Sequence, residues 1–231
     1  MSWIPEDYDS EWPFDLLKTS FKLDPQITAL LIIDVQSGAL VREPDTALGQ
    51  KYPEIVKYWN DRIDQFVIPN TRRLINHFRE NRMRVVYTRN GSVTPHGDES
   101  AERISQKRSG PGDRYRGRPA YEIASQIYPS DDDLVVDKLT SSAFHNTMLD
   151  HALRNMGIRD VVIAGILTDM CVFGTARMAA EIGYNALICE DACATNTQRA
   201  HNEALLMHAR VFGRVSTTQD ALDELIQAKH V

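Results

Sequence analysis

The stretch that decides the fold spans residues 161–172 and reads VVIAGILTDMCV. Its apolar, β-branched first half predicts a buried strand, and a helical pattern begins close to Cys171. The carboxyl ends of parallel strands face the ligand crevice, and a thiol in the first turn of the following helix lies near the positive end of the helix dipole. We therefore expect Cys171 to be a nucleophile that favours the thiolate form, rather than a buried structural cysteine.

Other apolar runs alternate with helical patterns along the chain. The predicted strands span residues 27–34, 84–88, 134–137 and 186–189. Helical patterns cover residues 63–82, 147–156, 170–182 and 198–209, with Pro69 at a start or kink. This alternation requires right-handed crossovers. The sequence thus predicts a three-layer α/β/α fold with a mostly parallel, roughly six-stranded sheet.

Length and composition bound the class of protein. The chain has 231 residues, so we expect one domain over residues 1–231. The formal net charge of −6 without a basic stripe argues against nucleic acid as a partner. Three cysteines, no secretory leader and no apolar run of about twenty residues indicate a soluble cytoplasmic protein, without disulfides and without a membrane partner.

Three segments stand apart from this alternation. Residues 1–24 form an aromatic N-terminal extension that we expect to pack on the surface or across a subunit boundary, within a homo-oligomer such as a dimer or tetramer. Residues 90–130 form a Gly- and Pro-rich excursion that we expect to shape the site, with a helix over 120–127. The basic stretch 103–118 within it is interpreted as a solvated loop rather than an anion site.

Three of the predicted strands lead to chemically useful side chains. Asp34 closes the first strand, Lys138 closes the third, and Cys171 follows the fourth. Because parallel strands end at one edge of a sheet, a carboxylate, an ammonium and a thiol are expected to meet there. The carboxylate can accept the thiol proton, and the ammonium can stabilise the charges. Each residue alone has a plainer role, as a helix cap, a surface charge or a core residue.

Several motifs resemble those of the isochorismatase-like cysteine hydrolases over residues 27–225. LIIDVQ at 31–36 resembles the family's first strand. DK at 137–138, followed by SAF at 142–144 and NT at 146–147, resembles its lysine motif. GILTDMCV at 165–172, followed by TAR at 175–177, resembles its nucleophile turn. The order and spacing of these motifs are more specific than any one of them.

The resemblance implies a mechanism and assigns it to residues. Asp34 would deprotonate Cys171 with electrostatic support from Lys138, and the thiolate would attack an amide carbonyl. An amine or ammonia would leave, and water would hydrolyse the thioester. The family's non-proline cis peptide would fall at Ile166–Leu167, with the backbone amides of Leu167 and Cys171 forming the oxyanion hole. No cofactor is implied.

Other members of the family help to narrow the reaction. Members that hydrolyse the vinyl ether of isochorismate lack the nucleophilic cysteine, so Cys171 favours an amide substrate. Nicotinamidases of the family carry an Asp-x-His metal motif, which residues 88–96 lack. His96 and Asp98 are interpreted as solvated loop residues, and we expect no metal.

The expected substrate is a small carbamoyl or ureido amide. Residues 87–91 and 108–112 resemble biuret-type ureidohydrolases, but Asn90, Ser92 and His208 replace the glutamate, histidine and glutamine of that group. Candidate substrate contacts are Gln36, Arg89, Phe144 and His208, although Arg89 could form a surface ion pair and His208 could pack against a helix. Nicotinamidase-, maleamate- or ureidoacrylate-type amides remain alternatives, as does a silent binding or scaffold member of the family.

Overall fold

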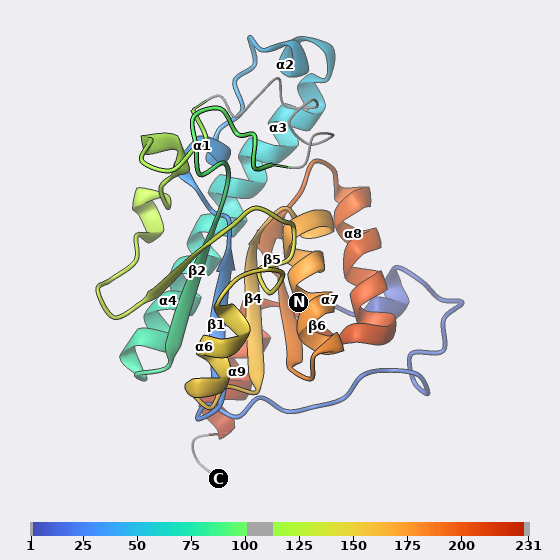
Figure 1. Ribbon diagram of the computed structural model, residues 1–231. Helices are drawn as coiled ribbons and strands as arrows, with labels where there is room; N and C mark the ends of the chain where they lie inside the picture. Colours follow the sequence, from blue (N-terminus) through green and yellow to red (C-terminus); the bar gives the residue numbers. More distant parts are fainter. Residues whose placement is uncertain (1, 101–112, 229–231) are drawn as a thin grey trace.

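Six parallel strands form a single sheet in the order β3-β2-β1-β4-β5-β6 (Figure 1). The computed structural model describes residues 2–100 and 113–228. The strands are β1 (Thr28–Ile33), β2 (Arg84–Asn90), β3 (Leu134–Lys138), β4 (Asp160–Ile166), β5 (Asn185–Ala194) and β6 (Arg214–Ser216). Every adjacent pair is parallel. The predicted α/β fold is confirmed.

Strands β1 and β4 form the centre of the sheet, where the direction of winding reverses. All residues of both strands are buried, and Ile33 pairs with Gly165 at their carboxyl ends. Gly165 has φ 122°, and a Cβ there would lie 2.2 Å from the Ile33 carbonyl oxygen. Only glycine fits this approach. The close contact brings the residues that follow β1 next to those that follow β4.

The helices keep the predicted positions, with additions. They are α1 (Ser37–Leu40), α2 (Ala47–Lys51), α3 (Pro53–Arg62), α4 (Ile68–Glu80), α6 (Leu149–Asn155), α7 (Phe173–Glu181), α8 (Gln198–Met207) and α9 (Thr218–Ala228). Pro69 lies in the first turn of α4, where its missing N–H is tolerated. The helix expected over 120–127 is instead two short 3₁₀ turns, Pro119–Tyr121 and Ser125–Ile127. π-helical turns extend three of the helices at Ile63–Val67, Thr168–Val172 and His208–Phe212.

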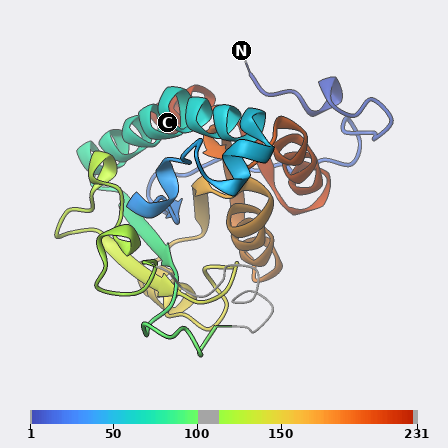
Figure 2. The ribbon, with the colours of Figure 1, turned by 90° about the horizontal axis from the view of Figure 1, so that it is seen from above.

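The sheet lies between two helical layers, seen from above in Figure 2. Leu30 and Ile32 of β1 belong to one hydrophobic cluster, which also holds residues of α3, α4 and α9. Leu31 and Ile33 belong to a second cluster, which holds residues of α6, α7 and α8. Successive residues of β1 therefore face opposite layers, as a strand buried on both faces requires.

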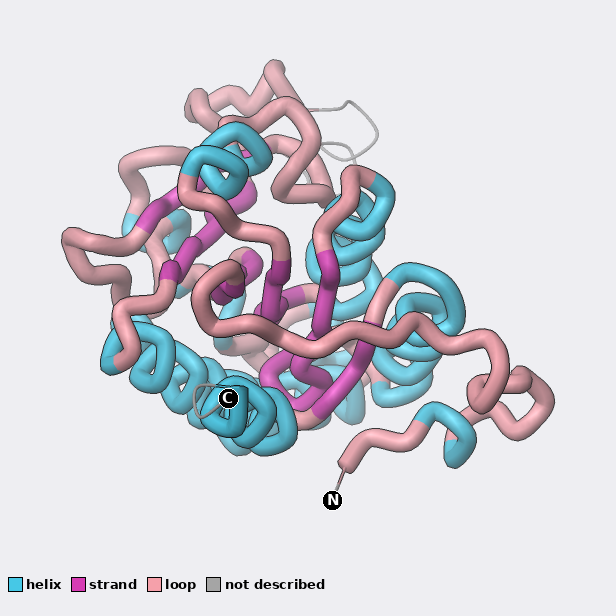
Figure 3. The backbone as a smooth tube through the Cα atoms, turned by 90° about the horizontal axis from the view of Figure 1, so that it is seen from below, coloured by secondary structure: helices cyan, strands magenta, loops and turns pink. Residues whose placement is uncertain are grey.

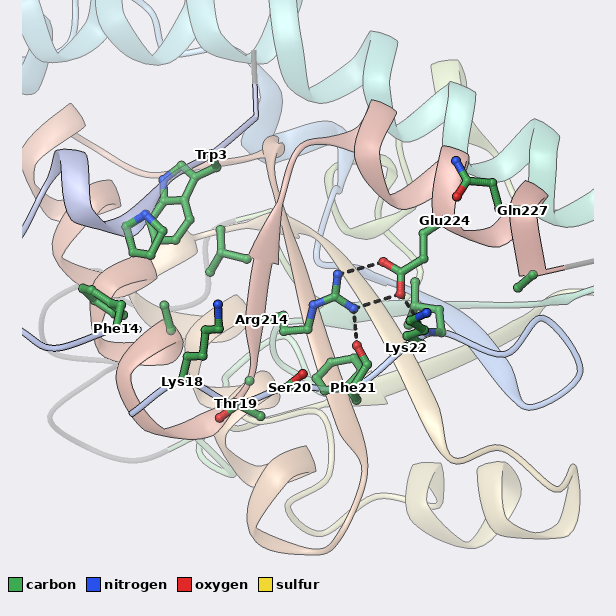
Figure 4. Close-up of a pocket in the computed structure, with 16 residues that line it drawn as sticks. Trp3, Phe14, Lys18, Thr19, Ser20, Phe21, Lys22, Arg214, Glu224 and Gln227 are labelled. Carbon is green, nitrogen blue, oxygen red and sulfur yellow. Dashed lines mark hydrogen bonds and ion pairs between the residues drawn. The ribbon is translucent and has the colours of Figure 1, made fainter. Parts of the chain in front are cut away.

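The N-terminal extension lies beside α8 and crosses the β6 edge of the sheet (Figures 2 and 3). Phe14 is buried, and Arg214 of β6 donates to the Phe21 carbonyl at 2.7 Å. A cavity of about 740 Å³ separates the extension from β6 and α9, and Figure 4 shows Arg214 reaching both Phe21 and Glu224 across it. The extension thus packs on the surface of its own chain and covers an edge strand.

The excursion after β2 packs against the start of α1. Ile123 forms an antiparallel bridge with Gln36, and Ser92 bridges to Tyr115. Residues 101–112, which hold most of the basic stretch 103–118, lie outside the described residues. Within the described part of that stretch, Arg116 pairs with Asp137. No helix in the described ranges is both long enough and apolar enough to span a membrane.

Candidate active site

Three predicted side chains meet at the carboxyl edge of the sheet. Asp34 follows β1, Lys138 ends β3, and Cys171 lies in the π-helical turn Thr168–Val172 that follows β4. β1 and β4 are the neighbours between which the strand order reverses. The chain leaves these two strands in opposite directions, so a crevice opens between the two connections. The topology alone therefore places a thiol and a carboxylate in one crevice.

Asp34 and Lys138 form a buried ion pair. Lys138 Nζ lies 2.7 Å from Asp34 Oδ2, and the two side chains are 0% and 7% exposed. The same ammonium donates to the carbonyls of Thr140 at 2.9 Å and Ser141 at 3.1 Å. Two carbonyls thus accept hydrogen bonds from Lys138, and its third interaction is the ion pair with Asp34. This arrangement fixes the Lys138 amine next to the Asp34 carboxyl group.

The backbone of Asp34 is in the left-handed region, with φ 54°. Its N–H donates to Thr88 Oγ1 at 3.1 Å, and the Thr88 hydroxyl donates to Asp34 Oδ1 at 2.6 Å. A non-glycine residue with this φ is uncommon and costs on the order of 1–3 kcal/mol. The buried Thr88 holds the carboxylate in place, so one oxygen faces Thr88 and the other faces Lys138.

The Cys171 thiol and Asp34 line the same cavity, and Cys171 lies close enough to Asp34 and Lys138 for both charges to shift the pKa of its thiol. Burial, which is the largest cause, and the charge of Asp34 together raise the pKa of the thiol to about 12, with Lys138 opposing the shift. A pKa raised in this way corresponds to a thiol that is protonated at rest, whereas the position of Cys171 after the strand predicted a thiolate. A protonated thiol beside a carboxylate can lose its proton as it attacks. Cys189 and Cys193 are fully buried in the core and lie outside the cavity described next.

A cavity of about 300 Å³ lies over this site. Its wall includes four of the residues selected from the sequence: Asp34, Gln36, Leu167 and Cys171. It also includes five side chains that the sequence did not single out for this role: Arg42, Trp59, Asn90, Arg114 and Met170. The peptide bond between Ile166 and Leu167 is cis, as the resemblance implied. The oxyanion role of Leu167 and Cys171 stays a prediction.

Gln36 and Arg89 are held by other parts of the protein. Gln36 Nε2 donates to the Tyr121 carbonyl at 2.6 Å, and its Oε1 accepts from the Asn90 N–H at 2.9 Å. Gln36 therefore lines the cavity while joining β2 to the excursion. The Arg89 guanidinium pairs with Asp137 at 2.7 Å and with Glu122 at 2.5 Å, and Arg89 does not line the cavity. Arg89 thus forms the ion pairs that were the alternative to a substrate contact.

Phe144 and His208 are core residues. The Phe144 ring packs 5.4 Å from the Tyr184 ring, between centroids. His208 is fully buried, and its Nε2 lies 3.1 Å from the Ala186 carbonyl near the amino end of β5. That end is opposite to the edge where Cys171 lies. The expected substrate contacts by Phe144 and His208 are thus corrected, and burial lowers the pKa of His208 to about 4.

A buried polar chain supports the turn that carries Cys171. Thr168 Oγ1 lies 2.8 Å from His201 Nδ1, and His201 Nε2 lies 2.8 Å from an Arg62 nitrogen. Because arginine can only donate, Nε2 accepts and the proton of the neutral ring sits on Nδ1. Burial lowers the pKa of His201, which favours that neutral form. No sequence pattern pointed to this chain, because its members come from α3, α8 and the turn after β4.

Within residues 2–100 and 113–228, no group of three or more His, Cys, Asp or Glu side chains could hold a metal ion. His96 and Asp98, the pair considered from the sequence, are both exposed on the excursion.

A thiol between a buried carboxylate and a buried ammonium, at the reversal point of a parallel sheet, is the arrangement of a cysteine hydrolase. A family model described as the isochorismatase domain matches residues 28–220. The chain belongs to the isochorismatase family, and the resemblance noted in its motifs is confirmed.

Named relatives include amide hydrolases. Ureidoacrylate amidohydrolase RutB of Acinetobacter baylyi is 26% identical over 87% of this chain and 84% of its own. A cysteine hydrolase of Pseudomonas syringae has a similar fold, with a TM-score of 0.73, 24% identity and coverage of 91% and 98%. N-carbamoylsarcosine amidase of Thermoplasma acidophilum has a TM-score of 0.63, 26% identity and coverage of 83% and 96%.

Proposed function

We propose that the protein is a cysteine-dependent amidohydrolase that cleaves a small carbamoyl or ureido amide. The observation that carries this proposal is the position of Cys171 beside the buried Asp34–Lys138 pair at the wall of a cavity. A volume of about 300 Å³ suits a small molecule. Two relatives support the substrate class, because ureidoacrylate and N-carbamoylsarcosine, the compounds in their names, both carry an N-carbamoyl group.

The first half of the reaction forms a thioester. As the Cys171 sulfur attacks the carbonyl carbon, the thiol proton passes to the Asp34 carboxylate and the carbonyl electron pair moves to oxygen. The N–H groups of Leu167 and Cys171 would stabilise that oxyanion. When the C–N bond breaks, the Asp34 proton passes to the leaving nitrogen. The raised pKa of the thiol suits this sequence, because proton transfer then accompanies attack.

The second half hydrolyses the thioester. Asp34, again a carboxylate, takes a proton from water as the water oxygen attacks the carbonyl carbon. The C–S bond breaks, and the proton on Asp34 returns to the Cys171 sulfur. Lys138 keeps its charge throughout and stabilises whichever anion is present, first the carboxylate and then the sulfur. The thiol and the carboxylate are both regenerated.

Ammonia release from a panel of amides tests this function. The panel contains N-carbamoyl amino acids, ureides, nicotinamide and maleamate, assayed with wild type, Cys171→Ala and Cys189→Ala. We expect turnover of carbamoyl compounds by wild type and by Cys189→Ala, whose cysteine lies in the core, but not by Cys171→Ala. Turnover that survives in Cys171→Ala would contradict a thiol nucleophile. Turnover of only nicotinamide or maleamate would show that the substrate class is not carbamoyl or ureido amides. No ammonia release from any compound would favour a binding module.

A further inference from the structure

The wall of the cavity carries the guanidinium of Arg42, which has no carboxylate partner among the described residues. Among the lining residues in the described part of the chain, the acidic one is Asp34, and Lys138 already balances it at 2.7 Å. A cavity with this charge favours an anionic occupant.

Arg42 is held rigidly at this wall. Its backbone N–H donates to Asn60 Oδ1, and its carbonyl accepts from Asn60 Nδ2, both at 3.0 Å. Its guanidinium carbon lies 3.9 Å from the centroid of the Trp59 ring. Trp59 is 1% exposed, and its Nε1 donates to the Leu40 carbonyl at 2.9 Å. The tryptophan is thus a fixed platform, and a stacked guanidinium keeps its N–H edges available for hydrogen bonds.

The guanidinium of Arg42 differs from those of other arginines near the site. Arg89 and Arg116 both pair with Asp137, whereas no described carboxylate lies within 4.0 Å of Arg42. Burial, together with the neighbouring charge of Arg114, lowers the pKa of Arg42, while carboxylate partners raise those of Arg89 and Arg116. Arg42 therefore has positive charge and planar donor edges without an acidic partner in the described chain.

We propose that Arg42, stacked on Trp59, binds a carboxylate of the substrate. The preferred substrates are then N-carbamoyl or ureido acids, and neutral ureas such as biuret are disfavoured. A planar guanidinium can bind a carboxylate through two parallel N–H···O bonds, which fix the substrate's orientation as well as its charge. This inference rests on the proposed hydrolase function, but its chemistry can be tested separately.

Substrate preference gives the first test. We compare kcat/KM for N-carbamoylglycine with that for 2-hydroxyethylurea, a neutral analogue of similar size, in wild type and Arg42→Gln. A charge-assisted hydrogen bond to a carboxylate corresponds to a preference of about ten- to hundredfold. We expect Arg42→Gln to lose that factor for the acid, mainly through KM, and to lose much less for the neutral urea. Equal losses for the two substrates would overturn the proposal.

Arg199→Gln and Arg42→Lys are the matched variants. Arg199 lies on α8 with its side chain 86% exposed, so Arg199→Gln removes one charge far from the cavity and should change neither value. Arg42→Lys keeps the charge but loses the planar edge, and we expect it to recover only part of the preference. Full recovery by lysine would overturn the two-bond contact.

Alkylation of Cys171 gives a test that needs no turnover. Iodoacetate carries a carboxylate and iodoacetamide does not, so the ratio of their rates at Cys171, divided by the same ratio for glutathione, reports on the cavity alone. We expect this normalised ratio to exceed one in wild type and to fall about tenfold in Arg42→Gln. If this result is obtained but no ureide is hydrolysed, the proposed hydrolase function is contradicted while the anion site is still supported. A wild-type ratio at or below one would overturn the anion site, even if Arg42→Gln failed to fold.

Discussion

Lys138 Nζ lies 2.7 Å from Asp34 Oδ2 in a place that solvent scarcely reaches. Removing both charges from water costs several kcal/mol per ion, and such pairs seldom contribute net stability against an apolar replacement. The pair nevertheless has its remaining hydrogen-bonding groups satisfied by Thr88, Thr140 and Ser141. We interpret it as a preorganised charge pair whose role lies in the reaction of the adjacent thiol.

A double-mutant cycle tests the mutual dependence of the two charges. Asp34→Asn or Lys138→Met alone leaves one buried charge without its partner, so each should lower the free energy of unfolding by about 3–5 kcal/mol. The double variant should lose less than the sum of the two, because no charge is then left unpaired. Urea denaturation measures all four proteins. Additive losses would show that the two side chains do not depend on each other.

Asp34→Asn should separate turnover from thiol reactivity. Asparagine tolerates the positive φ at this position, so the backbone is preserved. Without the base, kcat should fall by about 10²–10⁴. The charge of Asp34 raises the pKa of the Cys171 thiol, so its removal should lower that pKa and speed alkylation by iodoacetamide near neutral pH. Wild-type kcat in this variant would contradict the assignment of Asp34 as the base.

The alkylation rate of the wild-type thiol should depend on pH in the way that its raised pKa requires. With a pKa raised to about 12, the thiolate fraction of Cys171 increases with pH throughout the accessible range. Iodoacetamide alkylation should therefore rise about tenfold per pH unit between about pH 7 and pH 10 without reaching a plateau. A plateau below about pH 8 would mean that the resting enzyme already holds a thiolate.

Thr168→Val tests the support of the nucleophile turn. It removes the acceptor of the His201 Nδ1 proton and leaves a buried donor unsatisfied, at a cost of about 1–3 kcal/mol in unfolding free energy. We also expect a lower kcat, since the turn carries Cys171. Thr71→Val is the matched control, because the buried Thr71 hydroxyl has no partner among the described residues. The Thr71→Val variant should be as stable as wild type. An equal loss of unfolding free energy in both variants would show that the Thr168–His201 contact does not stabilise the turn.

His208 should make stability depend on pH without affecting catalysis. Its pKa is lowered from 6.5 to about 4 in the folded protein, so the unfolded chain binds a proton first as pH falls. The contribution of His208 is present above about pH 6.5 and is lost on acidification toward about pH 4, by about 3 kcal/mol at 1.4 kcal/mol per unit. His208→Gln should flatten this slope and retain kcat/KM. A variant with the wild-type slope, or with weakened substrate binding, would contradict the core placement.

The strands and the grouping of Asp34, Lys138 and Cys171 at one edge were predictable because both follow from local patterns and from the parallel-sheet rule. Apolar runs locate five of the six strands, and the parallel-sheet rule brings Asp34, Lys138 and Cys171 to one edge. β6 (Arg214–Ser216) was not located, because a strand of three residues is too short for a periodic pattern. The predicted six-stranded sheet is confirmed, although its last strand carries little signal of its own.

The rest of the site depends on contacts between distant residues. Arg89 lies where motif likeness placed it, but Glu122 and Asp137 from other segments decide which way its side chain points. Arg42 belongs to none of the sequence motifs, and its position in the cavity wall is set by Asn60 and Trp59 on α3. A sequence pattern identifies which residues share an element, whereas packing decides which side chains face the substrate.

Mass spectrometry of the acylated enzyme tests the central claim most directly. Wild type and Cys171→Ala would be quenched in acid during turnover of N-carbamoylglycine, digested, and compared peptide by peptide. We predict that the group left after ammonia departs, an N-carboxymethylcarbamoyl group, is found on the peptide containing Cys171 in wild type, and that both the adduct and the ammonia are lost in the variant. Steady turnover with no adduct on Cys171, or with the adduct on another residue, would contradict the thioester mechanism.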